Sequence, residues 1–368
     1  MGERMHLAFF GSSLVSAYWN GAATYYRGLL KGLSDLGYRI TFFEPDAYNR
    51  QKHRDIDEPS YAKSVVYGAD NQGIKSALHM ARQADMVIKT SGVGCFDEYL
   101  DEAVLEFQSE GKIVAFWDVD APATLDRVSA NPEDPFLKLI GEYDMVFTYG
   151  GGHRVINSYV RFGARSCIPI YNALDPSTHF PVSSEGRFTA ALGFLGNRMP
   201  DREERVKEFF FEPAQLLPGR RFLLGGNGWE SCMPHLENIK RLGHVYTQEH
   251  NAFNCSALAV LNINRLSMAQ YGFSPPTRIF EAAGAGACII SDKWEGIESF
   301  LQPDTECFVV SDGQEVASVL ENLTTEQARQ MGENARNRIL QHHTYTHRAK
   351  EVHDTLTQYK CGRKEIAR

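Results

Sequence analysis

The stretch from residue 5 to residue 43, MHLAFFGSSLVSAYWNGAATYYRGLLKGLSDLGYRITFF, decides how this chain folds. Its first six residues form an apolar run that ends at a glycine, which predicts a buried strand over 5–10. Residues 20–36 then repeat apolar side chains at helical spacing and stop at Gly37. A second strand is predicted over 39–43. This order of strand, helix and strand is typical of a parallel sheet covered by helices.

The same alternation extends along the rest of the chain in two series, separated by a polar, turn-rich stretch at 172–188. In the first series we predict further strands at 86–89, 113–117 and 145–148, with helices at 72–83 and 97–109. In the second we predict strands at 191–195, 221–224, 258–263, 288–291 and 307–310, with helices at 201–211, 248–255, 277–285, 313–322, 325–341 and 345–359. The fold class is therefore α/β, with two doubly wound, Rossmann-like domains. We place them at 1–172 and 189–344, joined by a linker at 173–188, and treat 345–368 as a separate C-terminal helix.

Composition excludes several classes of protein. Of the 368 residues, 43% are hydrophobic and 23% are charged, as in ordinary globular enzymes. The net charge of −8 argues against nucleic acid as a partner. We find no apolar run of about 18 residues that would span a membrane and no signal-like core after residues 1–4. The seven cysteines form no C-x-x-C pair, so we expect reduced thiols, a cytoplasmic location and no zinc.

The most informative local pattern lies at residues 271–299, YGFSPPTRIFEAAGAGACIISDKWEGIES. A Gly-Phe-Ser-Pro-Pro turn leads into a helix that opens near Thr277. The unpaired amides of a helix start attract a diphosphate, Arg278 adds a guanidinium, and Glu281 lies one turn further, where a carboxylate accepts both hydroxyls of a ribose. An ordinary helix start with an exposed Arg–Glu pair has the same spacing. The candidate binding residues here are Ser274, Pro275, Thr277, Arg278 and Glu281.

Three other loops follow predicted strands, where α/β sheets bind ligands. Their glycines allow a phosphate to approach, their polar side chains donate hydrogen bonds, and Trp229 offers a face for stacking on a base. Each also fits a plain turn, and a tryptophan beside a tight turn is equally typical of a core. The candidates are Gly11, Asn20 and Gly21 in the first loop, Gly196, Asn197 and Arg198 in the second, and Gly226 and Trp229 in the third. Arg202 and Arg205 we interpret as a solvated helix face.

Residues 278–298, RIFEAAGAGACIISDKWEGIE, resemble the donor-site block of GT-B glycosyltransferases, specifically the CgeB-like (spore maturation protein B) family within the broad glycosyltransferase group 1. The stretches 117–122, 194–205, 242–246 and 261–265 match the layout of that family. The resemblance implies two domains facing across a cleft, with the C-terminal helix returning to the first, acceptor-side domain.

The resemblance also implies roles for individual residues. Glu281 would hold the ribose, the amides from Ser274 to Arg278 the diphosphate, and His244 and Val245 the base, with Arg265 in a further matching block. Retaining members usually carry a second glutamate eight residues before Glu281, and this chain has Phe273 there. That departure leaves the identity of the sugar open.

Asp118 and Asp120 follow the predicted strand at 113–117 and are the candidate catalytic residues. One of them would act as general base for an acceptor hydroxyl or stabilise positive charge on the sugar. Either would equally serve as a helix cap before Pro122. Residues 55–57 repeat the Asp-x-Asp spacing in a predicted loop, so we predict no metal site.

The leading hypothesis is a metal-independent glycosyltransferase, of hexosyltransferase type and retaining, that uses a nucleotide sugar, with UDP favoured. The sugar donor is then a substrate, and no cofactor is expected. The acceptor stays unknown, and nucleic acid is not expected as a partner. Two alternatives share the architecture: a sugar-nucleotide 2-epimerase and a non-catalytic scaffold protein.

Overall fold

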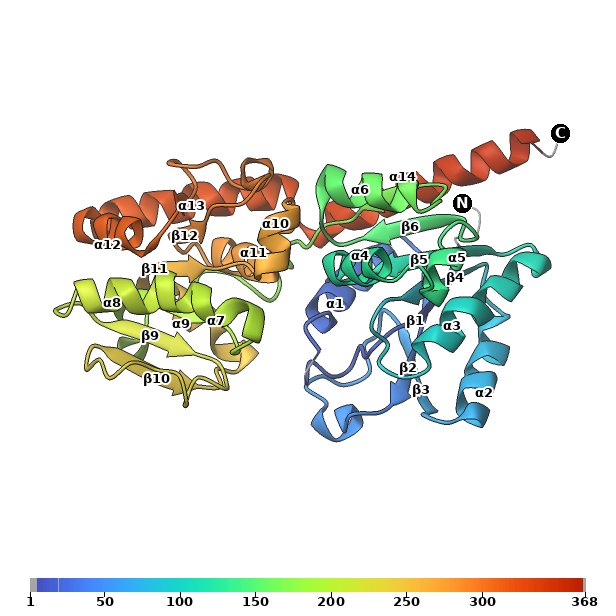
Figure 1. The fold of residues 1–368 in the computed structure, drawn as a ribbon, viewed down its shortest axis with the longest axis horizontal. Coiled ribbons are helices and arrows are strands. Elements are labelled where there is room, and N and C mark those ends of the chain that lie inside the picture. Colours follow the sequence, from blue (N-terminus) through green and yellow to red (C-terminus); the bar gives the residue numbers. More distant parts are fainter. Residues whose placement is uncertain (1–4, 19, 367–368) are drawn as a thin grey trace. The chain divides into compact units, whose positions relative to one another are not determined.

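The computed structural model describes residues 5–18 and 20–366, and the chain divides into two compact units (Figure 1). Unit 1 comprises Met1–Tyr171 together with Tyr345–Arg368, and unit 2 comprises Asn172–Thr344. The stretch 173–188, which we expected to be a linker, belongs to unit 2. Residues 1–4, Trp19 and 367–368 lie outside the described residues. They belong to the predicted domain at 1–172 and to the predicted C-terminal segment at 345–368.

Unit 1 is built on a seven-stranded sheet in the order β3-β2-β1-β4-β5-β6-β7. All its strand pairs are parallel, and β1 lies between β2 and β4, with Leu7 opposite both Ile40 and Met86. The strands are β1 (His6–Phe10), β2 (Arg39–Asp46), β3 (Lys63–Gly68), β4 (Met86–Thr90), β5 (Ile113–Asp118), β6 (Met145–Thr148) and β7 (Cys167–Pro169). The helices are α1 (Ala23–Asp35), α2 (Asn71–Ala81), α3 (Asp97–Ala103), α4 (Ala121–Ala130), α5 (Pro135–Leu139), α6 (Gly152–Arg161) and α14 (Tyr345–Ile366).

The last helix of the chain, α14, packs on α1 and so completes unit 1. Two glycines of α1 make this close approach possible. A Cβ atom on Gly28 would lie 2.0 Å from the ring of Tyr345, and one on Gly32 would lie 2.9 Å from the Cβ atom of Ala349. Side chains at these two positions would therefore separate the helices.

Unit 2 is built on a six-stranded parallel sheet in the order β10-β9-β8-β11-β12-β13. A buried hydrophobic cluster of this unit includes Phe194, Phe210, Phe222 and Trp229. The strands are β8 (Ala190–Leu195), β9 (Phe222–Gly225), β10 (Ile239–Gly243), β11 (Ala257–Asn262), β12 (Ile289–Asp292) and β13 (Phe308–Val310). The helices are α7 (Pro200–Val206), α8 (Glu212–Leu216), α9 (His250–Ser256), α10 (Leu266–Tyr271), α11 (Thr277–Gly284), α12 (Gly313–Asn322) and α13 (Thr325–His342).

The predicted α/β class with two parallel sheets is thus confirmed. In each sheet the loops that follow the strands bring together residues distant in the sequence, as expected for doubly wound folds. None of the helices among the described residues combines the length and the apolar character needed to cross a bilayer.

Candidate functional site

A cavity of about 340 Å³ in unit 2 gathers most of the residues that the sequence singled out in this half of the chain. It lies where β8 and β9 end and α11 begins. Eight predicted residues line it: Gly196, Asn197, Gly226, His244, Val245, Thr277, Arg278 and Glu281. Five further residues complete the lining: Leu195, Arg202, His250, Asn254 and Pro276.

The start of α11 faces this cavity and is held by a rigid turn. Pro276 is the residue that precedes the helix, and the carbonyl of Pro275 accepts a 3.1 Å hydrogen bond from the side-chain amide of Asn172. Ser274 is buried and donates its hydroxyl hydrogen to the carbonyl of Gly272, so its side chain braces the turn. Prolines carry no N–H group, so the first amides of α11 open to an anion belong to Thr277 and Arg278. This is fewer donors than the five-residue span we predicted.

The Arg278 guanidinium is fixed against the end of β8. Its Nε donates to the carbonyl of Leu195 at 2.7 Å and its Nη1 to Oδ1 of Asn262 at 3.2 Å, while the group lies 4.9 Å from the centre of the Phe194 ring. Burial and the nearby charge of Arg202 lower the pKa of Arg278. Two guanidiniums, those of Arg202 and Arg278, and one carboxylate, that of Glu281, line the cavity, and this excess of positive groups favours a bound anion.

A second guanidinium, that of Arg202, reaches the same point. A Cβ atom on Gly196 would lie 3.0 Å from Nη1 of Arg202 and 3.1 Å from Nη2 of Arg278, so the glycine leaves room for both. Nη1 of Arg202 donates to the carbonyl of Asn197, and its Nε is buried without a partner among the described residues. We had interpreted Arg202 as solvated. The structure instead leaves Arg202 half-buried, and it lines the cavity.

Trp229 is fully buried and does not line the cavity, so it offers no face for stacking on a base. Its Nε1 donates a 2.7 Å hydrogen bond to the carbonyl of Gly196. The neighbouring Gly226 has a φ of +118°, and a Cβ atom there would lie 2.2 Å from the same carbonyl. Trp229 and Gly226 therefore fix the loop that carries Gly196.

Replacing Trp229 with phenylalanine is expected to lower the free energy of unfolding by about 1–3 kcal/mol, because the carbonyl of Gly196 loses its donor and the smaller ring leaves space in the core. Urea denaturation followed by circular dichroism measures the change. Tyr246→Phe, at a side chain that is 61% exposed, serves as the control and should leave the transition in place. An unchanged transition for the Trp229 variant would show that this bond contributes nothing to stability.

Two predicted arginines point elsewhere. Nε of Arg198 donates to Glu203 at 2.6 Å, and Nε of Arg265 donates to Asp201 at 2.6 Å. Neither lines the cavity. Each guanidinium is instead held in an ion pair by a carboxylate of α7. Arg205, the other arginine we took to be solvated, pairs with the buried Asp292.

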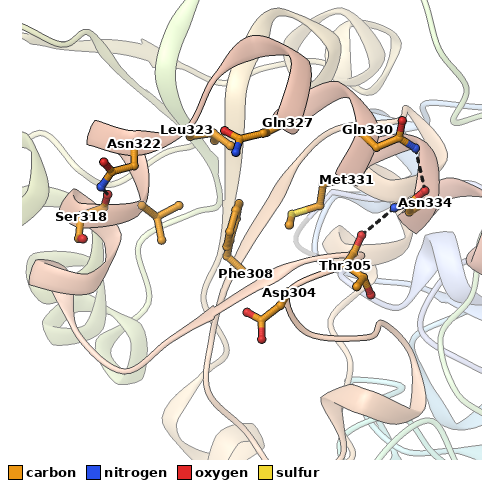
Figure 2. Close-up of a pocket in the computed structure, with 11 residues that line it drawn as sticks. Asp304, Thr305, Phe308, Ser318, Asn322, Leu323, Gln327, Gln330, Met331 and Asn334 are labelled. Carbon is orange, nitrogen blue, oxygen red and sulfur yellow. Dashed lines mark hydrogen bonds between the residues drawn. The ribbon is translucent and has the colours of Figure 1, made fainter.

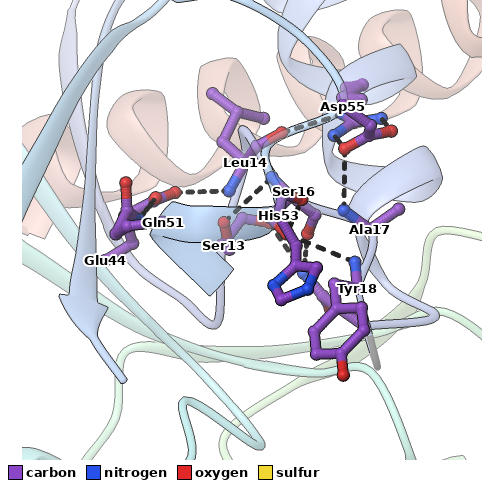
Figure 3. Close-up of polar contacts among 11 residues, drawn as sticks. Ser13, Leu14, Ser16, Ala17, Tyr18, Glu44, Gln51, His53 and Asp55 are labelled. Atoms are coloured by element: carbon purple, nitrogen blue, oxygen red, sulfur yellow. Dashed lines mark hydrogen bonds and ion pairs between the residues drawn. The ribbon is translucent and has the colours of Figure 1, made fainter. Parts of the chain in front are cut away.

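In unit 1, the loop after β1 is an internally bonded structure (Figure 3). The side chain of Asn20 is buried and bonds to Ser12, Ser13 and Ser16 within the loop. Figure 3 shows how Ala17 and Tyr18 are tied to the segment around His53 and Asp55. The side chain of Asn20 therefore makes these hydrogen bonds within the loop rather than to a ligand.

The two predicted glycines of this loop differ from each other. A Cβ atom on Gly11 would lie 2.3 Å from the ring of Phe42, so this glycine serves packing. Gly21 is exposed and has open space around its Cα. The contact with a ligand that we expected from Gly11 and Gly21 remains a prediction.

The two candidate aspartates at the end of β5 differ sharply in exposure. Asp118 is fully buried and accepts hydrogen bonds from Ser91, Tyr159 and the amide of Asp120. Burial raises the pKa of Asp118. Because its carboxylate oxygens accept these three hydrogen bonds, Asp118 holds the loop after β5 in place. Its carboxylate is not exposed to a sugar acceptor. Asp120 precedes α4 without capping it through its side chain.

Asp120 lines a second cavity, of about 450 Å³, within unit 1. Lys89 is buried at one wall and forms ion pairs with Asp97 at 2.8 Å and Asp101 at 2.6 Å. Arg127 belongs to the same lining. This cavity therefore combines a neutralised buried cation with polar side chains at the carboxyl ends of β4 and β5.

A third cavity, of about 590 Å³, lies in unit 2 beside β13, α12 and α13 (Figure 2). Amide side chains dominate its rim, but they serve local structure. Asn322 bonds to Ser318, Gln330 to Asn334, and Asn334 to the carbonyl of Thr305. Asp304 is the one acidic residue of its lining and no lysine or arginine belongs to it, so this cavity lacks the positive charge that a diphosphate requires.

Sequence reasoning missed several residues that build the first cavity. Asn172 and Asn262 position the α11 turn and Arg278, and neither is among the candidate residues that the sequence predicts. His250 lines the cavity from α9, and His179 lies 3.9 Å from Glu281. The side chain of Glu281 is itself 20% exposed. No local sequence pattern links these residues, because Asn172 and Asn262, like His179 and His250, are more than 70 positions apart in the chain.

Residues 202–354 match a family model described as Glycosyl transferase-like. A search of curated proteins found no match. The family match starts in α7 and ends in α14, so it includes every cavity residue from Arg202 onward.

Solved structures resemble the whole chain. A sucrose-phosphate synthase from Thermosynechococcus elongatus has a TM-score of 0.69 at 12% identity, covering 98% of this chain and 100% of that one. HepE from Anabaena, in complex with UDP and glucose, has a TM-score of 0.69 at 12% identity over 96% of this chain and 100% of that one. An α-glucosyltransferase in complex with UDP has a TM-score of 0.70 at 12% identity over the same shares. The chain therefore has the two-domain GT-B fold of these proteins.

Proposed function

We propose that this protein is a glycosyltransferase that binds a UDP-sugar in the unit 2 cavity and transfers the sugar to an acceptor. The observation that carries the proposal is the convergence of Arg202 and Arg278 at Gly196, beside the start of α11 and one turn from Glu281. Two guanidiniums and helix amides suit a diphosphate, and a carboxylate suits ribose hydroxyls. The family match and the UDP complexes of HepE and the α-glucosyltransferase support the same assignment.

In the reaction we propose, the bond between the anomeric carbon and the diphosphate oxygen breaks, and the diphosphate leaves with the electron pair. The acceptor oxygen bonds to the anomeric carbon and gives its proton to a base. Arg202, Arg278 and the α11 amides stabilise the charge on the leaving diphosphate, so we propose transfer without a metal ion. By the resemblance to the retaining group, we propose that the configuration at the anomeric carbon is kept.

The base belongs to the acceptor side, which we place in unit 1. Asp118 is excluded by its burial and its three donors, so we assign Asp120, at the rim of the unit 1 cavity, to this role. We further propose a cytoplasmic location, from the cysteine pattern, and sugars of the hexose class. The chemical nature of the acceptor is left to experiment.

Isothermal titration calorimetry against UDP, GDP, ADP and dTDP tests the donor assignment. We expect binding of UDP in EDTA at micromolar concentration and at least about tenfold weaker binding of dTDP, because Glu281 is placed to hold ribose hydroxyls. Failure of every nucleotide to bind would overturn the proposal. Epimerisation of the sugar of a UDP-sugar without any acceptor, rather than its hydrolysis, would instead identify an isomerase.

A further inference from the structure

Three possible metal ligands lie together at one side of the nucleotide cavity. One ring nitrogen each of His179 and His250 and one carboxylate oxygen of Glu281 all lie within 4.8 Å of one another. They come from the segment before β8, from α9 and from α11, so only the folded unit 2 unites them. The proposed transferase reaction uses Glu281 but neither histidine.

The hydrogen bonds around His179 leave one ring nitrogen with a lone pair. The Thr178 hydroxyl lies 3.1 Å from the carbonyl oxygen of Asp175 and 2.9 Å from Nδ1 of His179. A carbonyl only accepts, so the hydroxyl gives its hydrogen to Asp175 and accepts one from Nδ1. In the neutral ring with its hydrogen on Nδ1, the lone pair belongs to Nε2 of His179. This nitrogen is buried, and it has no hydrogen-bond partner in the part of the chain that the structure describes.

This lone pair faces a carboxylate. Nε2 of His179 lies 3.9 Å from Oε1 of Glu281, beyond hydrogen-bond distance. Two electron-rich atoms, Nε2 of His179 and Oε1 of Glu281, therefore face each other. The side chain of His179 is only 4% exposed. Such a pair is stabilised by a cation between the two atoms.

His250 offers a further lone pair. Its Nε2 lies 3.3 Å from the carbonyl oxygen of Val245, so Nε2 carries the hydrogen and Nδ1 the lone pair. The opposing charges are the guanidiniums of Arg202 and Arg278, which line the same cavity. A cation here must consequently be held by coordination to imidazole rather than by net negative charge.

We propose that His179, His250 and Glu281 bind one transition-metal ion of the Zn²⁺ type. Two imidazoles and one carboxylate suit zinc or cobalt, whereas magnesium and calcium prefer oxygen ligands. Ligands about 2.0–2.2 Å from a tetrahedral ion lie roughly 3.4 Å apart. The side chains of His179 and Glu281 would therefore close by about half an ångström, and the remaining position would open to the cavity.

The consequence is competition between metal and nucleotide. The ion occupies the carboxylate that the proposed function assigns to the ribose, so it acts as an inhibitor of nucleotide binding. This competition rests on the proposed function, whereas the metal site itself does not. The proposed metal site also differs from the expectation, drawn from the sequence, that the chain holds no zinc.

Cobalt titration of the tag-free, full-length protein, freed of metal with EDTA and then of EDTA, tests the site. We expect one Co²⁺ per chain, with the strong visible absorption of a tetrahedral centre. His179→Gln and His250→Gln should each weaken binding at least about tenfold. His244→Gln is the matched control, because His244 lines the cavity outside the cluster, and it should bind Co²⁺ like the original protein.

Each result separates the two proposals. Absence of a tetrahedral Co²⁺ spectrum, or unchanged binding in both histidine variants, would overturn the metal site whatever UDP does. With the site present, added UDP should remove the cobalt absorption. Persistence of that absorption while UDP binds would refute the competition and leave the nucleotide assignment intact.

Discussion

Replacement of Arg278 by alanine is expected to reduce kcat/KM for sugar transfer by about 10²–10³-fold. The Arg278 guanidinium is anchored by Leu195 and Asn262, so it is already in place when the diphosphate leaves. Preorganised charge of this kind contributes about 3–4 kcal/mol to stabilisation of the transition state. Steady-state kinetics with a UDP-sugar donor, or donor hydrolysis where the acceptor is unknown, measures the loss.

The controls for Arg278 lie in the same region. Arg198→Ala removes a neighbouring guanidinium that is paired with Glu203 outside the cavity, and it should change kcat/KM less than about threefold. Arg278→Lys keeps the charge without the planar fork and should retain intermediate activity. Equal losses in the Arg198 and Arg278 variants would mean that general electrostatics, rather than this position, governs the reaction.

Replacement of Glu281 by alanine is expected to raise the Kd for UDP about 100-fold. A carboxylate that accepts two ribose hydroxyls contributes about 1.5–3 kcal/mol per hydrogen bond, part of which water replaces in the variant. The original protein should bind UDP far more tightly than 2′,3′-dideoxy-UDP, and the variant should bind the two ligands alike. Calorimetry in EDTA gives all four affinities and so the coupling between the side chain and the hydroxyls.

Two further variants make this measurement specific. Glu281→Gln retains one acceptor and should give an intermediate Kd. Glu326→Ala removes an exposed carboxylate on α13 and should leave the Kd unchanged. A Glu281 variant that still discriminates between UDP and its dideoxy analogue would remove the ribose role from this residue.

How far the sequence predicts the fold depends on where each strand lies in its sheet. The interior strands β1, β4, β5 and β6 are buried along their whole length, so they form continuous apolar runs that the sequence displays. The missed strands β3, β7 and β10 are all sheet edges. Because an edge strand buries one side and mixes polar residues such as Lys240 and Arg241, its pattern resembles a loop.

The candidate site divides in a similar way. Thr277, Arg278 and Glu281 lie within one helix, so their common surface follows from helical spacing alone. The direction of Arg198 and Arg202 depends on Glu203 and on β8, and no local pattern contains that information. His179 and His250 were missed for the same reason, since the fold alone brings them to Glu281.

The path of the chain through the two units bears on how the protein is made. The chain leaves unit 1 after Tyr171 and returns at Tyr345, so unit 2 is an insertion inside unit 1. On the ribosome, all of unit 2 emerges before α14 does, and it can finish folding while the α1 surface around Gly28 is still uncovered. Loss of the last residues by a premature stop would therefore damage the first-made half of the protein and spare the half made just before the break.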